Sequence, residues 1–121
     1  MGVAKMAAYT RAGILRYLDG KDSKKIGHNT YAYVEDGNVG IRYHNTTIVG
    51  LFTDGTMILN NGGWHTTTTS GRMHAFSMEN GGGRVGIKNG TMLYYPPHDG
   101  TPVEMTSPIH VDLTTGEVIK H

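Results

Sequence analysis

The chain has 121 residues, enough for one modest hydrophobic core, and we expect residues 1–121 to form a single domain. It contains no cysteine, which excludes disulfides, thiolate nucleophiles and zinc–thiolate sites. Charged residues make up 17% of the chain and the formal net charge is +1, so long nucleic acid is not a favoured partner.

The start of the chain predicts a helix followed by a loop. Apolar side chains such as Met6, Ile14 and Leu18 roughly follow the helical period over residues 3–18, and Asp19-Gly20 would end the helix. Residues 21–27 are polar and indicate a loop. No apolar run approaches the roughly 20 residues that span a bilayer, and a secretory signal is not evident. We therefore expect no membrane association and a cytosolic setting.

Four turn signals then predict four hairpins. Asp or Asn followed by glycine, or Thr-Thr-Gly, supplies the positive φ angles of tight hairpin turns. The expected strand pairs are 30–34 with 39–44, 47–52 with 56–59, 84–88 with 91–95, and 109–113 with 117–120. In the third hairpin a two-residue loop sets Arg84 opposite Tyr95 and Lys88 opposite Thr91.

One helix is expected to interrupt these strands. Thr69 can cap a helix over residues 70–78, in which Met73 and Phe76 face the core, and the glycines at 81–83 would end it. Residues 98–108 indicate a loop. The predicted fold is mainly β (α+β): an antiparallel hairpin-built sheet, arranged as a small sandwich or open barrel, with an N-terminal helix and one short central helix.

Donor and cationic side chains gather in the middle of the sequence, which favours an anionic ligand. Strand alternation places Arg42 and His44 on one face. Residues 64–69 also alternate, so His65, Thr67 and Thr69 share a side. These hydroxyls lead into a helix N-terminus, where free N–H groups and the helix dipole attract anions, and Arg72 would lie in its first turn. The expected ligand-binding residues are Arg42, His44, Trp64, His65, Thr67, Thr69 and Arg72.

Each of these features also has a purely structural explanation. The threonine run can simply be strand and helix cap, and Arg42 with His44 can be a solvent-facing stripe. Trp64 can belong to the core or to a subunit contact, because burial of its ring is favourable. No spacing typical of a metal site occurs, and no metal or other cofactor is expected.

The segment from Gly27 to Phe76 resembles a family of small proteins of tailed bacteriophages. That family has the pattern H-N-T, R-x-H-x-T, D-G-T, L-x-x-G-G-W/Y, T-x-T-T and an Arg near the start of a helix. The matching positions are His28, Asn29, Thr30, Arg42, His44, Thr46, Asp54, Gly55, Thr56, Leu59, Gly62, Gly63, Trp64, Thr66, Thr68, Thr69 and Arg72. The resemblance implies a viral origin and the host cytoplasm as the setting, and it carries no activity over to this chain.

Three functions stay open on the sequence. The favoured one is a phage binding protein that captures a phosphate-bearing ligand, with a nucleotide expected, and so counters a host defence signal. The second is a metal-independent phosphodiesterase or nuclease in which His44 and His65 act as acid and base beside Arg42. The third is a virion or protein-interaction component. The expected partners are a small anion or a host defence protein, and a homo-oligomer is expected because small chains often complete their sites with a second subunit.

Overall fold

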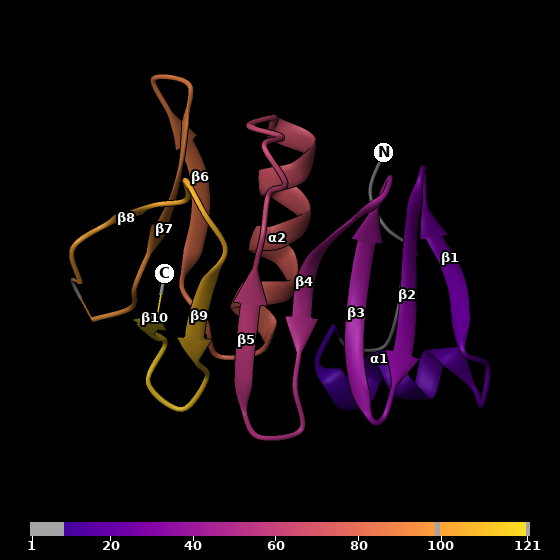
Figure 1. The fold of residues 1–121 in the computed structure, drawn as a ribbon. Helices are drawn as coiled ribbons and strands as arrows, with labels where there is room; N and C mark the ends of the chain where they lie inside the picture. Colours follow the sequence, from indigo (N-terminus) through magenta and orange to yellow (C-terminus); the bar gives the residue numbers. More distant parts are fainter. Residues whose placement is uncertain (1–8, 99, 121) are drawn as a thin grey trace.

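The computed structural model describes residues 9–98 and 100–120, which form two helices and ten strands (Figure 1). The elements are α1 (Arg11–Leu18), β1 (Ser23–Gly27), β2 (Thr30–Glu35), β3 (Asn38–Tyr43), β4 (Thr46–Leu51), β5 (Thr56–Leu59), α2 (Thr67–Glu79), β6 (Arg84–Lys88), β7 (Thr91–Tyr95), β8 (Val103–Glu104), β9 (Ile109–Asp112) and β10 (Glu117–Lys120). The predicted mainly β fold with antiparallel hairpins is confirmed.

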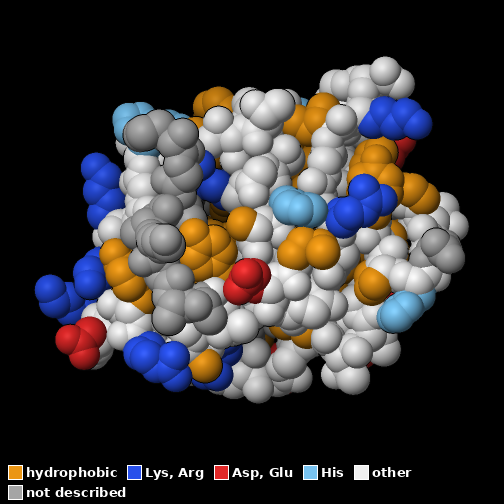
Figure 2. All heavy atoms as spheres, turned by 180° about the vertical axis from the view of Figure 1, so that it is seen from behind, with side chains coloured by type: hydrophobic (Ala, Val, Ile, Leu, Met, Phe, Trp, Pro, Cys, Tyr) orange, Lys and Arg blue, Asp and Glu red, His pale blue; other side chains and the backbone are white. Residues whose placement is uncertain are grey.

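The strands form two sheets, neither of them closed into a barrel. The larger sheet has seven strands in the order β1-β2-β3-β4-β5-β9-β10, and the smaller has the order β6-β7-β8. In Figure 1 both helices lie behind the larger sheet, so its front is the face without helices, which we call the open face. From the helix side, several Lys and Arg side chains gather at the edge where α1 and β1 lie (Figure 2).

The core fills the space between the larger sheet and the two helices. It includes Ile14 of α1, Ile41 of β3 and Phe76 of α2, all fully buried. Helix α2 packs against both β4 and β6 and so joins the two sheets. At about 25 cal/mol for each Å² of apolar surface removed from water, this burial is the main source of stability in a chain without disulfides.

The structure corrects several predicted boundaries. Within the described part of the chain the first helix starts at Arg11, capped by Thr10, while the predicted residues before Tyr9 lie outside the described residues. The predicted loop 21–27 contains β1, and loop 98–108 contains β8. Polar side chains hid β1 because it is an edge strand, where lysines are common.

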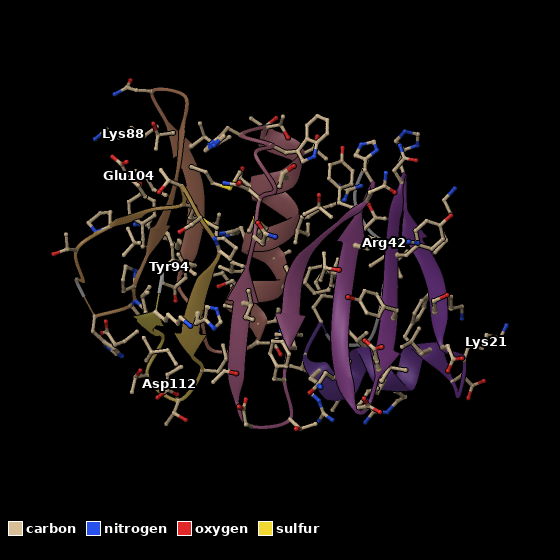
Figure 3. All side chains as sticks on the ribbon, in the orientation of Figure 1. Lys21, Arg42, Lys88, Tyr94, Glu104 and Asp112 are labelled. Carbon is tan, nitrogen blue, oxygen red and sulfur yellow. The ribbon has the colours of Figure 1, made fainter. Side chains whose placement is uncertain are left out.

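Tyr94 connects three separate parts of the fold. Its hydroxyl accepts a hydrogen bond from the Gly83 N–H (2.8 Å), just before β6, and donates one to the Gly116 carbonyl (2.6 Å), just before β10 (Figure 3). Tyr94 is fully buried. Burial raises the pKa of Tyr94, the Gly83 hydrogen bond lowers it in part, and the Glu117 charge raises it further.

Tyr94→Phe is expected to lower the free energy of unfolding by about 1–3 kcal/mol, because two buried backbone groups lose their partner. Chemical denaturation of both proteins at neutral pH measures this difference. An unchanged free energy would contradict the bridging role of the hydroxyl.

The same substitution is expected to change the response to alkaline pH. The folded pKa of Tyr94 lies above its ordinary value of 10.0, so the unfolded chain loses this proton first. The stabilisation is therefore complete below pH 10.0 and disappears as the pH rises through the folded pKa. The wild type should lose stability more steeply than Tyr94→Phe above that pH, and parallel curves would contradict this.

Candidate functional site

Arg42 lies on the open face because of the β2–β3 turn. Asp36 and Gly37 both have positive φ (53° and 80°), and this two-residue turn pairs Glu35 with Asn38 and therefore Tyr31 with Arg42. The Arg42 guanidinium lies over the Tyr31 ring, with 4.9 Å between Cζ and the ring centroid (Figure 3). Arg42 is exposed, so this cation sits on an aromatic surface in contact with water.

Four side chains continue this arrangement across the sheet. Lys25 pairs with Tyr31, and Arg42 pairs with Thr47, and partners in a ladder project from the same face. We call Lys25, Tyr31, Arg42 and Thr47 the basic row. Lys25 and Arg42 are both exposed and two strands apart, which separates their Cα atoms by roughly 10 Å. Two cations therefore flank one aromatic ring.

A hollow of about 290 Å³ borders the basic row, lined by Ser23, Tyr31, Tyr33, Arg42 and Thr47. Its wall is held rigidly. The Tyr33 ring lies across Gly40, where any Cβ would collide with it, and the Tyr33 hydroxyl is hydrogen-bonded to Thr47 Oγ1 at 2.7 Å. Glycine at position 40 thus lets an aromatic ring lie flat on the sheet.

Acidic side chains lie at the other end of the same strands. A second hollow of about 260 Å³ on the far side of Tyr33 is lined by Glu35, Asp36 and Phe52, among others. Glu35 is four residues along β2 from Tyr31, which corresponds to roughly 13 Å. The open face is therefore basic at one end of β2 and acidic at the other, and of these two ends the basic row favours an anion.

Arg72, one of the expected ligand-binding residues, lies on the opposite face of the sheet from Arg42. Its Nε donates a 2.8 Å hydrogen bond to Thr30 Oγ1, and its guanidinium lies 5.1 Å from the Tyr43 ring centroid. Thr30 and Tyr43 are the neighbours of Tyr31 and Arg42, so alternation points them to the helix side. Arg72 is only 7% exposed, and its guanidinium contacts Thr30 and Tyr43 in the interior.

The threonine run is helical rather than extended. Thr66, not Thr69, caps α2, since its hydroxyl accepts from the Thr69 N–H at 3.2 Å. The strand alternation predicted for residues 64–69 is therefore wrong, and Arg72 lies in the second turn of the helix. Thr69 is fully buried, while Thr67 is exposed, so these two hydroxyls do not face one surface.

His44, Trp64 and His65 lie near the start of α2. The predicted extension of β3 to His44 is wrong by one residue: the strand ends at Tyr43, and His44 has a left-handed φ of 54°. The His44 ring stacks on Trp64 with 5.7 Å between centroids, and Trp64 is 47% exposed rather than in the core. His65 Nδ1 accepts a 3.3 Å hydrogen bond from the Met92 N–H.

Comparison with protein families places the chain among phage proteins. The family described as Kyanoviridae Gp96 protein matches residues 10–112. The chain belongs to this family. Kyanoviridae is a phage family, so the predicted phage origin is confirmed. No curated protein and no solved structure matches the chain.

Two structural findings bear on the chemistry open to this Gp96-family protein. Among residues 9–98 and 100–120, no group of three or more His, Asp or Glu side chains is placed to hold a metal ion. No helix in that same part of the chain is long and apolar enough to cross a membrane.

The sequence of this Gp96-family chain carries a signal for part of the basic row in its Asp36-Gly37 turn. Once Asp36-Gly37 is taken as a two-residue turn, the register alone pairs Tyr31 with Arg42 and Tyr33 with Gly40. The same turn does not predict the position of Lys25, because the polar residues 21–27 indicate a loop rather than strand β1. The hydrogen bond between Tyr33 and Thr47 joins side chains two strands apart, and no local sequence pattern predicts it.

Substitution of Arg72 and of Arg42 is expected to change the free energy of unfolding by different amounts. Arg72→Ala is expected to lower the free energy of unfolding by about 2–3 kcal/mol, since it removes a buried hydrogen bond from a charged donor and leaves a cavity. Arg42→Ala is expected to change it by less than about 0.5 kcal/mol, because Arg42 is exposed. Denaturation of the two variants side by side measures both. Equal losses would contradict the assignment of the two arginines to different faces.

Proposed function

We propose that this phage protein captures a small phosphate-bearing ligand of the nucleotide class at the basic row on the open face of its larger sheet. The observation that carries the proposal is the Arg42 guanidinium, exposed and lying over Tyr31, with no acidic partner among the described residues. A guanidinium held on a ring keeps its N–H donors directed outward, and these match the paired oxygens of a phosphate.

The residues around Arg42 supply the other contacts that a nucleotide needs. Lys25 adds a second positive charge across Tyr31. Thr47 and Ser23 bring hydroxyls to the same hollow. The Tyr33 ring and the Arg42 plane are flat surfaces on which a base can stack. The combination of cations, hydroxyls and rings therefore favours a nucleotide over a simple inorganic anion.

The charge pattern favours a small ligand over a long nucleic acid. The basic row contains two cations, and the acidic end of the open face begins roughly 13 Å away. A strand of nucleic acid crossing this face would bring its phosphates against Glu35 and Asp36. A mononucleotide or cyclic dinucleotide meets only the basic end. Removal of a host signalling nucleotide from the host cytoplasm is the role that such capture would serve.

The phosphodiesterase alternative has less support. It requires His44, His65 and Arg42 around one scissile bond. Arg42 contacts Tyr31 on the open face, whereas His44 stacks on Trp64 and His65 accepts from a backbone N–H of β7. Among the described residues these three side chains have no contact with one another that would make a common centre.

Thermal unfolding with a panel of mononucleotides, cyclic mononucleotides and cyclic dinucleotides tests the proposal. One class should raise Tm, since a ligand at about 100 times its Kd stabilises the folded state by about 2.7 kcal/mol. Arg42→Ala should then weaken binding by about 10–100-fold in calorimetry, the loss expected for a hydrogen bond to a charged group.

Arg84→Ala is the matched control. Arg84 is also exposed and lies over a tyrosine ring, that of Tyr95 at 4.6 Å, but on the smaller sheet. The Arg84→Ala variant should bind the ligand with the same affinity as the wild type. A panel that never moves Tm, or equal losses from Arg42→Ala and Arg84→Ala, would contradict the proposal and favour an interaction role.

A further inference from the structure

A hollow of about 540 Å³ lies where the end of α2 meets the smaller sheet. Its volume falls within the range of about 300–1,000 Å³ that is usual for small-molecule sites. Three elements converge on it, because α2 ends nearby, β6 begins there and β7 ends there. We call it the proline hollow, and the residues that line it include Met78, Gly83, Arg84, Tyr95, Pro96 and Pro97.

The walls of the proline hollow are held by close backbone packing. Gly100 lies so near to Pro96 that a Cβ at Gly100 would stand only 2.6 Å from the Pro96 Cβ. On the other side, the Gly83 N–H donates to the Tyr94 hydroxyl (2.8 Å), and the Gly83 carbonyl accepts from Ser77 Oγ (2.7 Å). The shape of the hollow is therefore set by the fold itself, which lowers the free-energy cost of binding a ligand there.

The charge of the proline hollow favours an anion. Arg84 is exposed, and its guanidinium lies over the Tyr95 ring with 4.6 Å between Cζ and the ring centroid. His98 is the other basic side chain, and no Asp or Glu is among the described residues of the lining. Glu79, next to Met78, accepts a 3.2 Å hydrogen bond from the Tyr9 N–H instead. The paired N–H donors of Arg84 match the two oxygens of a carboxylate.

The remaining side chains of the lining are apolar or aromatic. Met78 is 48% exposed although it is a large hydrophobic residue, and it lines the same hollow as Tyr95, Pro96 and Pro97. Methionine is unbranched and adapts to apolar partners of different shapes. Proline has no backbone N–H to donate, so the charged donors come from Arg84. A guanidinium among apolar walls suits a ligand that has one negative charge on an apolar body.

We propose that the proline hollow binds a carboxylate joined to an apolar or aromatic body, with the carboxylate on Arg84 and the body against Met78 and Pro97. A phosphate monoester suits it less well, because it carries about −1.5 to −2 charges at pH 7. Free organic acids and the C-terminal residue of a protein share the proposed chemistry. The hollow lies on the smaller sheet, whereas the basic row spans β1 to β4, so this proposal does not depend on nucleotide capture.

An amide NMR titration with 3-phenylpropionate tests the site, and 3-phenylpropionamide is the uncharged match. The acid should shift the amide signals of Gly82, Gly83 and Arg84, and the uncharged compound should bind about tenfold more weakly. Arg84→Ala should weaken binding of the acid by about tenfold for the same reason. Met78→Glu should weaken it by a similar factor, because it adds a negative charge to the lining.

Lys88→Ala is the matched control, since Lys88 is also an exposed cation of β6 but does not line the hollow. It should bind the acid with wild-type affinity, and the thermal transition of each variant verifies that it is folded. No shift changes around the hollow, equal binding of the acid and its amide, or equal affinities of Arg84→Ala and Lys88→Ala would overturn the proposal.

A pentapeptide that ends in phenylalanine with a free carboxylate distinguishes the two sources of the ligand. Binding at least about tenfold tighter than that of 3-phenylpropionate, and lost when the C-terminus is amidated, would support the proposal with a protein C-terminus as the ligand. Binding no tighter than that of the small acid would support it with a free organic acid. Nucleotide affinity measured on Met78→Glu separates failure of this site from failure of the basic row.

Discussion

The register of the β2–β3 hairpin is the constraint on which the rest of the account depends. A two-residue turn at Asp36-Gly37 fixes which residues pair, and strand alternation then assigns every side chain to one of two faces. Tyr31 and Arg42 go to the open face, and their neighbours Thr30 and Tyr43 go to the helix side. A shift of one residue would exchange the two sets and destroy both the core and the basic row.

This division gives the two arginines of the predicted site different tasks. Arg72 comes from α2 and reaches the sheet from the helix side, where Thr30 accepts its hydrogen bond and Tyr43 covers it. A buried guanidinium is stable only with such partners, so Arg72 helps to position the helix on the sheet. Arg42 is exposed and has no buried partners of this kind among the described residues. It rests on one ring in contact with water, as expected of a cation that meets a ligand.

Local turn chemistry made much of the fold predictable, and long-range packing limited the rest. Asn89-Gly90 correctly predicted the pairing of Arg84 with Tyr95, and Asp36-Gly37 forms a two-residue turn of the same kind. The β4–β5 and β9–β10 hairpins also form as predicted, but with longer loops. Lys24 and Lys25 concealed β1, since an edge strand needs no apolar alternation. The threonine run favours strand by propensity, but Thr66 caps α2 and Thr69 is buried in its first turn, so the run begins a helix instead. Of the candidate site, Arg42 was identified from sequence, whereas its neighbours depended on the register.

The central claim is that an anion meets the basic row and not the start of α2. An amide NMR titration with adenosine monophosphate tests it most directly, because each backbone position reports separately. The account predicts the largest shift changes at Lys25, Tyr31, Arg42 and Thr47, with little change at Thr66 to Thr68. Changes concentrated at the start of α2, or no changes at the basic row, would contradict it.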